Sequence, residues 1–398
     1  MPPSFISTRR HPALFIAAMV VLVCVAFTFF LGAPQFVALM THQWHFTPSQ
    51  IGFIVTADTI GNAVGALAVA LGIRGWPVRR ILGAGTLAIM GGNALIAAGL
   101  GVQLAIAGGF VAGVGNGIVS GTAVGFLTYG VAPQRNIAIM VVAENLYAML
   151  LNVAILPGVG GRWEASGVFL FITAVCVVCL PAMAFFGRRE TIPAAFREGR
   201  VHKAGVYLTL ASLYIFYVSV GIVWTFLSTR AEAAGIERPV INQMLGISNI
   251  LSLVVCFLVP AMARHSLYGW TLLVLVLCTG SQVLLAAPLS VTSFAVATIA
   301  FVPMWTLTGI LLPTHVPAFD PVGRHAALIP AVLGLGYSTG SFLGGVVGEA
   351  VSTPRAFQVA ASVACVSVLV LLAQRALAGK LGAGLPAEAE IPPPNLVV

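Results

Sequence analysis

The sequence GRRETIPAAFREGRVHK, at residues 187–203, is the most charged stretch of the chain and lies almost at its midpoint. Long apolar stretches with short polar breaks lie on both sides of it. Ile192, Ala195 and Phe196 share a side, so the segment is either an amphipathic helix on a membrane surface or a plain solvated loop. In both cases it divides the chain into two apolar halves of similar length.

The composition excludes a soluble globular protein. Of the 398 residues, 59% are hydrophobic and 8% are charged, and the mean hydropathy is +1.03. Soluble domains carry about 25% charged residues because their surfaces face water, so most of this surface must face lipid. Soluble enzymes, nucleic-acid binders, coiled coils and disordered scaffolds are thereby set aside.

Twelve apolar stretches are long enough to cross a bilayer, which takes about 20 residues per helix. Six precede the charged segment and six follow it, so we expect an all-α integral membrane protein with twelve transmembrane helices in two six-helix bundles. The stretches are 13–40, 51–72, 81–101, 104–130, 137–158, 167–187, 204–229, 240–262, 268–287, 291–313, 326–348 and 356–377. The expected units are an N-terminal bundle at 1–187, a cytoplasmic linker at 188–203, a C-terminal bundle at 204–381 and a disordered, Pro-rich tail at 382–398.

The basic residues indicate how the chain lies in the membrane. The net charge is +8 and the pI is about 9.5. If the N-terminus is cytoplasmic, 15 of the 19 Lys and Arg residues face the cytoplasm, and the other four are Arg162, Arg230, Arg238 and Arg355. This bias follows the positive-inside rule. It predicts a multi-pass protein of the inner membrane with both termini in the cytoplasm, and no nucleic-acid partner.

Two stretches carry glycine at every fourth position, which aligns the glycines along one side of a helix. Such a side lets another helix backbone approach closely, and in repeat-built transporters it suits helices that pack tightly and slide. The glycines are Gly109, Gly113, Gly117, Gly121 and Gly125 in the fourth span, and Gly336, Gly340, Gly344 and Gly348 in the eleventh.

Twelve spans in two halves, with a basic central segment, resemble the major facilitator superfamily of secondary transporters. Gly65-x-Leu67, followed by basic residues, is similar to the family's loop between the second and third spans. Leu156-Pro-Gly-Val-Gly-Gly161 is similar to a motif of its antiporter branch. The resemblance implies rocking of 13–187 against 204–377. Arginines at helix ends would lock the cytoplasmic gate by meeting helix carbonyls, namely Arg74, Arg79, Arg80, Arg135 and Arg324.

Asp58 and Glu144 are the only two of the 11 acidic residues that fall well inside the expected spans. An ionisable group in hydrocarbon is costly and normally faces a cavity. Desolvation favours the protonated carboxyl, so both residues suit proton coupling or substrate binding. The alternatives are that Asp58 caps a local polar network and that Glu144 pairs with Arg135.

An aromatic stripe in the seventh span indicates a helix side turned towards protein or a cavity, because Tyr and Trp polar atoms need partners in lipid. The expected cavity holds acidic but no basic groups, which favours a neutral, amphipathic or cationic small molecule over an anion. Its candidate lining residues are Thr28, Gln35, Asn62, Asn145, Tyr147, Tyr214, Tyr217, Trp224, Asn249 and Tyr337.

We therefore expect a proton-coupled secondary transporter, with the motif at 156–161 favouring efflux. The alternatives are an uptake symporter for a small nutrient and a membrane sensor that binds without transporting. An enzyme is not expected, because the histidines within reach of the spans sit at span ends or in loops, and no phosphate loop is present for ATP. The expected partners are the substrate, protons and the lipid bilayer, with no cofactor or metal and a monomeric chain.

Overall fold

The computed structural model describes residues 12–71, 76–128, 133–180, 203–263, 266–319 and 328–380. All the regular elements within these ranges are helices. Residues 188–202 of the expected linker, the expected tail, Arg74 and Arg324 lie outside them.

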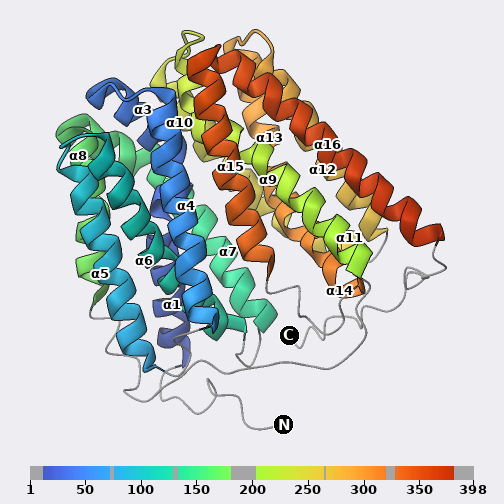
Figure 1. The fold of residues 1–398 in the computed structure, drawn as a ribbon, viewed down its shortest axis with the longest axis horizontal. Coiled ribbons are helices and arrows are strands. Elements are labelled where there is room, and N and C mark those ends of the chain that lie inside the picture. The colour runs from blue at the N-terminus through green and yellow to red at the C-terminus, as the bar shows by residue number, and fades with distance from the viewer. Residues whose placement is uncertain are drawn as a thin grey trace.

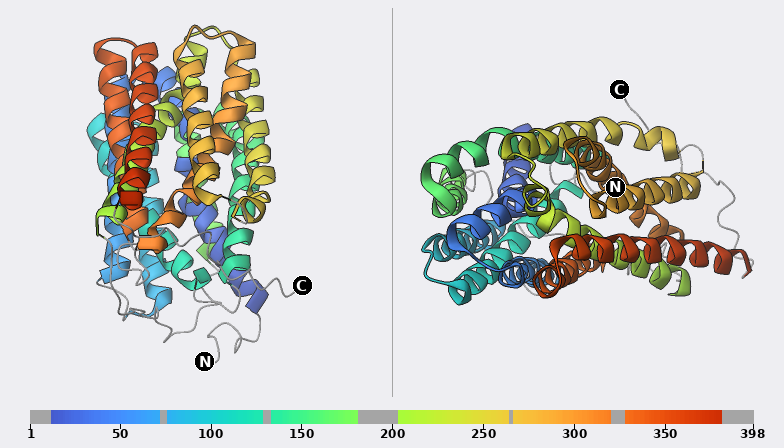
Figure 2. Two further views of the ribbon diagram at one scale, coloured as in Figure 1. Left: turned by 90° about the vertical axis from the view of Figure 1, so that its right-hand side faces the viewer. Right: turned by 90° about the horizontal axis from the view of Figure 1, so that it is seen from above.

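The helices form two groups that follow the chain order. Seen from above in Figure 2, helices coloured blue to green gather on one side and those coloured yellow to red on the other. The first group is α1 (Pro12–Ala26), α2 (Thr28–Leu31), α3 (Ala33–Trp44), α4 (Pro48–Leu71), α5 (Val78–Ala97), α6 (Val102–Thr128), α7 (Pro133–Leu150), the π-helix η1 (Leu151–Ile155) and α8 (Leu156–Cys179). The second is α9 (Lys203–Glu232), α10 (Arg238–Cys256), α11 (Val259–Ala263), α12 (Leu267–Ala286), α13 (Val291–Leu311), the 3-10 helix η3 (Pro313–His315), α14 (Val316–Phe319), α15 (Ile329–Ala350) and α16 (Thr353–Lys380).

Local sequence signals set several helix starts and turns. The Ser266 hydroxyl accepts a hydrogen bond from the Gly269 N–H at the start of α12, and Ser290 and Ser293 form a capping box at the start of α13. Gly235, between α9 and α10, has a φ of 79°, which glycine adopts without steric cost. These residues define short connections between antiparallel helices.

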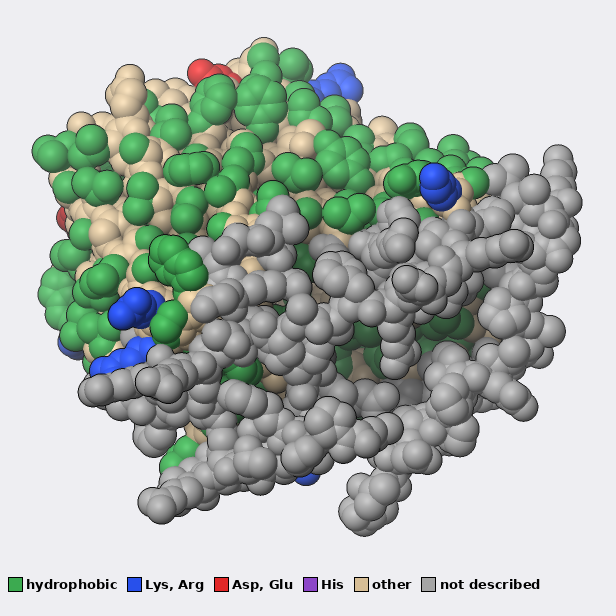
Figure 3. Space-filling model, turned by 60° about the horizontal axis from the view of Figure 1, so that its bottom comes forward, with side chains coloured by type: hydrophobic (Ala, Val, Ile, Leu, Met, Phe, Trp, Pro, Cys, Tyr) green, Lys and Arg blue, Asp and Glu red, His purple; other side chains and the backbone are tan. Residues whose placement is uncertain are grey.

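Helices long and apolar enough to cross a membrane number ten within the described ranges. Nine of them overlap one expected span each, as α4 does with 51–72 and α13 with 291–313, and the tenth covers both 137–158 and 167–187. The expected span 13–40 is not among the ten, because it is divided among three shorter helices, α1, α2 and α3. Hydrophobic side chains cover much of the coloured part of the surface in Figure 3. A multi-pass helical membrane protein is thereby confirmed.

One of the ten stretches, Ala138–Cys179, runs for 42 residues and is bent back on itself. Within it, Glu164 has a φ of 60° and a ψ of −163°, outside the helical region. A Cβ placed on Gly160 would lie 3.5 Å from Cγ2 of Val168, whereas residues eight apart in a straight helix are about 12 Å apart. The chain therefore reverses direction at Glu164.

The glycine ladders bring helix backbones together within each group. On α6, Gly113 and Gly117 contact the carbonyl oxygens of Asp58 and Asn62 on α4. On α15, a Cβ placed on Gly336 would lie 2.6 Å from the Tyr214 carbonyl oxygen on α9. A Cβ on Gly109 would lie 3.0 Å from a carbonyl of α4, Gly121 also faces α4, Gly340 contacts α9 and Gly344 faces Phe226 of α9, whereas Gly348 faces Pro48 of α4 in the other group. The backbone of α6 therefore packs closely on α4 and that of α15 on α9, and the end of the α15 ladder faces the N-terminal group.

The two groups contact each other through α4 and α15, α3 and α9, and α7 and α10 (Figure 1). At the end of the molecule away from Arg79 and Arg135, Nε2 of His42 lies 2.6 Å from Oε2 of Glu232. Deeper in the interface, the Thr56 hydroxyl on α4 donates to the Ser338 carbonyl on α15 at 3.1 Å. Contacts between the two helix groups therefore extend from this end of the molecule towards its interior.

Candidate functional site

Asp58 lies in a small pocket inside the N-terminal group. Its side chain is 5% exposed, and the Asn116 Nδ2 on α6 donates to its Oδ1 at 3.2 Å. The glycines of α6 permit this hydrogen bond, because they let α6 approach the backbone of α4. The pocket has room for about one water molecule and is lined by Val25, Ala26, Phe29, Ile54, Asp58, Asn93, Ile96, Gly109, Ala112, Asn116 and Ile172.

Glu144 lies elsewhere, on α7, and is half-buried. Arg135 is exposed, and within the described part of the chain it makes no ion pair with Glu144. Glu144 is also absent from the residues that line the Asp58 pocket. The two acidic candidates therefore belong to different places in the N-terminal group.

A second set of polar side chains joins α1, α2 and α3 to α7 and η1. The Thr28 and Tyr147 hydroxyls lie 2.9 Å apart. Gln35 Nε2 donates to the Asn152 carbonyl at 2.6 Å, and Asn152 Nδ2 donates to the Leu31 carbonyl at 3.1 Å. Leu31 ends α2, where carbonyls lack helical partners. The break between α2 and α3 therefore gives η1 an acceptor to bind.

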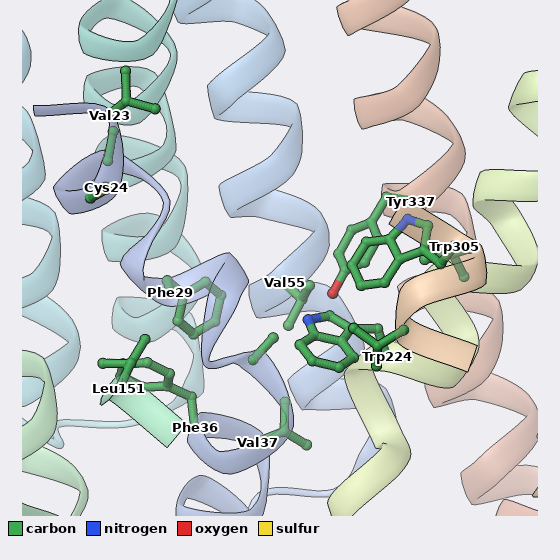
Figure 4. Packing of buried hydrophobic residues seen from close by; sticks show 14 of the residues in the cluster. Val23, Cys24, Phe29, Phe36, Val37, Val55, Leu151, Trp224, Trp305 and Tyr337 are labelled. Atoms are coloured by element: carbon green, nitrogen blue, oxygen red, sulfur yellow. The ribbon is translucent and has the colours of Figure 1, made fainter. Parts of the chain in front are cut away.

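Four aromatic side chains meet where α2, α9, α13 and α15 come together, and we call them the aromatic cluster: Phe30, Trp224, Trp305 and Tyr337. Figure 4 shows Trp224, Trp305 and Tyr337 close together. The ring centroids of Phe30 lie 4.9 Å from Tyr337 and 5.9 Å from Trp305. Trp224 and Trp305 are 5.2 Å apart, and the Trp224 Nε1 donates to the Phe30 carbonyl at 2.8 Å. The cluster therefore spans the two groups, because Phe30 alone comes from the first.

The hydroxyls next to the cluster are satisfied within the C-terminal group. Thr225 donates to the Tyr337 hydroxyl at 3.2 Å, and the Tyr214 hydroxyl lies 2.9 Å from the Thr339 hydroxyl. The Tyr217 hydroxyl lies against Gly309 on α13. The aromatic side chains of α9, which form the stripe expected from the sequence, thus contact residues of α2, α13 and α15.

The remaining candidates stand apart from the cluster. The Asn145 and Asn249 amides each donate to a carbonyl of their own helix, those of Val141 and Leu245. Asn62 is half-buried on α4. Of the expected gate, Arg79, Arg80 and Arg135 are exposed and form no ion pair with other residues that the structure describes.

Five residues of the Asp58 pocket, the Gln35 hydrogen bonds and the aromatic cluster were missed in the sequence. Asn93, Asn116 and Asn152 are amides inside apolar spans, where a polar side chain needs a partner. Trp305 stands in mid-span, whereas Trp is typical of span ends. Phe30 gave no signal, because phenylalanine is common throughout apolar spans.

The described helices define the class, a multi-pass helical membrane protein. No protein-family model matches the sequence, and no curated protein matches it. The crystal structure of the nucleoside transporter NupG matches with a TM-score of 0.69 and 12% identity, over 91% of this chain and 99% of that one. A mutant of NupG matches with 0.69 and 13%, over 90% and 99%. This chain therefore shares the fold of NupG.

Proposed function

We propose that the protein is a secondary transporter of the inner membrane that moves a small neutral, amphipathic or cationic molecule by alternating access. Its two moving bodies are residues 13–187 and 204–377, and both termini face the cytoplasm. The chain crosses the membrane twelve times, since the turn at Glu164 divides one long stretch into two crossings and α1 to α3 together make another.

The aromatic cluster is the observation that carries this proposal. Trp224, Trp305 and Tyr337 lie about 12 to 21 Å along their helices from the end that holds Glu232, which is near the middle of a bilayer about 30 Å thick. The cluster lies between the moving bodies and holds no charged side chain. Such a surface suits a flat, uncharged ring, and because NupG is a nucleoside transporter, nucleosides are the first substrates to test.

Asp58 and Glu144 are the proposed proton carriers. Neither forms an ion pair with a described basic residue, so a bound proton removes the cost of a charge in a low-dielectric site. Asp58 is coupled to the moving interface through α4, whose Thr56 bonds to α15 two residues away. Glu144 stands one turn from Tyr147, which bonds to Thr28 on the first span.

The structure corresponds to a state closed at the end that holds His42 and Glu232. In the proposed cycle this is the outer end, and Arg79, Arg80 and Arg135 close the opposite, cytoplasmic end in the alternate state, together with Arg74 and Arg324. Helix carbonyl ends carry partial negative charge, so exposed arginines at helix ends have partners to meet when the cytoplasmic side closes.

The direction of transport is a choice between efflux, which the motif at 156–161 favours, and uptake. Gly160 faces Leu39 on α3, at 3.1 Å from a placed Cβ. Gly158 and Gly161 have no such neighbour within 4 Å in the described part of the chain. Only one of the motif's three glycines therefore contacts a neighbouring helix. This packing gives the motif, and with it efflux, little support, and it favours uptake as the alternative.

Transport into proteoliposomes tests the proposal. Purified protein is reconstituted, a pH gradient is imposed in either direction, and accumulation of radiolabelled nucleosides and other neutral compounds is measured. Accumulation above the equilibrium level that collapses with a protonophore supports proton-coupled transport, and the active gradient gives its direction. Saturable binding with no accumulation identifies a sensor instead and overturns the proposal.

A tryptophan pair provides the matched control. Trp305→Ala removes a buried ring of the aromatic cluster and is expected to lower uptake by about 5-fold to 160-fold, since one stacked ring is worth about 1–3 kcal/mol for a base and 1.36 kcal/mol is tenfold. Trp163→Ala removes a ring that is 63% exposed at the outer end and is expected to leave uptake unchanged. Equal losses in the two variants exclude the cluster as the binding site.

A further inference from the structure

The pocket around Asp58 differs from the rest of the membrane interior in its polar lining. Asp58, Asn93 and Asn116 are 5%, 3% and 5% exposed, and they reach the pocket from α4, α5 and α6. The other eight lining residues are apolar or glycine. The pocket lies wholly inside the N-terminal group, and no residue of the aromatic cluster lines it. Its lining therefore differs from that of the proposed substrate position, and Tyr337 is the residue of the aromatic cluster that interacts electrostatically with Asp58.

The groups left free in this pocket are oxygen acceptors. Asn93 Nδ2 donates to the Ile89 carbonyl at 2.9 Å, and Asn116 Nδ2 donates to Asp58 Oδ1 at 3.2 Å. The Oδ1 atoms of the two asparagines and Oδ2 of Asp58 have no hydrogen-bond donor among the residues described. One carboxylate and two amide oxygens around a water-sized space form a set of hard ligands.

We propose that Asp58, Asn93 and Asn116 bind a small monovalent cation, with Na⁺ as the probe. A proton needs only the carboxylate, whereas a metal cation uses all three side chains. A single carboxylate neutralises one positive charge, and a divalent ion would leave an unpaired charge in the membrane, which is costly. Organic cations are excluded by size, because the pocket has room for about one water molecule.

The cation site deepens the proposed function, and only its role in transport rests on that function. Under this proposal Asp58 binds a cation that a proton can displace, and Glu144 carries protons alone. The C-terminal group has no counterpart, since its described acidic residues Glu232, Glu237 and Glu349 lie at helix ends. One cation per chain is therefore expected, held by the helix that also forms the interface with α15.

Equilibrium binding of ²²Na⁺ to the purified full-length protein in nanodiscs tests the site, at constant ionic strength with choline as the replacement cation. The wild type is expected to bind one Na⁺ per chain, more weakly as the pH falls because protons compete. Asp58→Asn is expected to abolish binding, and Asn93→Ala and Asn116→Ala to weaken it about 10-fold or more. Li⁺ should displace ²²Na⁺ better than K⁺ does, because the space is small.

Gln374→Ala is the matched control. Gln374 is a buried amide of α16, 4% exposed, that donates to the Thr209 hydroxyl at 3.0 Å, and its loss should leave Na⁺ binding within twofold. Absence of saturable binding to the wild type overturns the proposal, as does unchanged binding in all three pocket variants. If Asp58→Asn does not fold, the two asparagine variants decide. Transport driven by a pH gradient in Na⁺-free buffer tests the proposed function separately, because it can succeed while the cation site fails.

Discussion

Removing Glu232 should loosen the closure between the two halves at the outer end. Glu232 ends α9, and its carboxylate lies 2.6 Å from His42 on α3 and 2.6 Å from Arg238 on α10. Of these two Glu232 contacts, only the one to His42 crosses between the two groups, and the His42 side chain is 50% exposed. Exposed pairs are worth about 0.2–1 kcal/mol. Since 1.36 kcal/mol is tenfold, Glu232→Ala should raise the ratio of outer-open to outer-closed molecules by up to about fivefold.

Distances between spin labels at Arg162 and Arg355 measure this ratio. Both residues are exposed and lie at the expected outer ends of the two groups, and the labels are attached in a background without the six native cysteines. Glu237→Ala is the control, because it removes the same charge close by at an exposed side chain that makes no ion pair within the described ranges. If the two variants shift the distances equally, the change reflects net charge, and the His42–Glu232 contact does not hold the halves closed.

Three further variants test the packing. Gly113→Leu forces a side chain into the Asp58 carbonyl and should lower the free energy of unfolding by more than about 3 kcal/mol, which is measured as a loss of monodisperse protein. Gly158→Leu, at a position with open space, should be tolerated. Equal yields of the two variants contradict this prediction. Asn152→Ala removes a buried amide from its partners and should cost about 1–3 kcal/mol by thermal unfolding, and Asn145→Ala, which loses one bond to its own helix, should cost less. Trp224→Phe loses the hydrogen bond to Phe30 and should lower the melting temperature by the equivalent of about 1 kcal/mol; an unchanged melting temperature excludes a net contribution.

Helix positions could be predicted from the sequence, because a membrane selects for apolar length and little else. The expected spans 51–72 and 291–313 therefore agree with α4 and α13. The turn at Glu164 also falls in the short connection expected between 137–158 and 167–187. The packing partners were beyond the sequence. The two glycine ladders look alike as spacing, yet α6 packs on α4 and α15 packs on α9, since spacing specifies one surface and leaves its partner open.

The candidate sites were only partly predictable, because the sequence identifies unusual residues and does not identify their partners on other helices. Asp58 is recognisable because a charge in hydrocarbon is rare, but its partner Asn116 is 58 positions away, and only the fold brings the two together. Asn62, a candidate lining residue one turn from Asp58 on the same helix, has no hydrogen bond to it in the part of the chain that the structure describes. Short-range spacing identifies neighbours on one helix, whereas a buried acid is satisfied across helices.

The two halves hold different chemistry, and this difference has a mechanistic consequence. The buried carboxyl Asp58 and the half-buried Glu144 lie in the N-terminal group, whereas three of the four rings of the aromatic cluster come from the C-terminal group. In the latter, the polar groups next to the cluster are hydroxyls that bond to one another, such as Thr225 with Ser341 at 2.8 Å. In the proposed cycle, an ion bound at Asp58 or Glu144 changes the charge of only one half, so its binding energy reaches the proposed substrate position only through contacts between the halves. Trp224 to Phe30 and Thr56 to Ser338 are two such contacts, and weakening them should uncouple ion binding from substrate binding while each site keeps its own affinity.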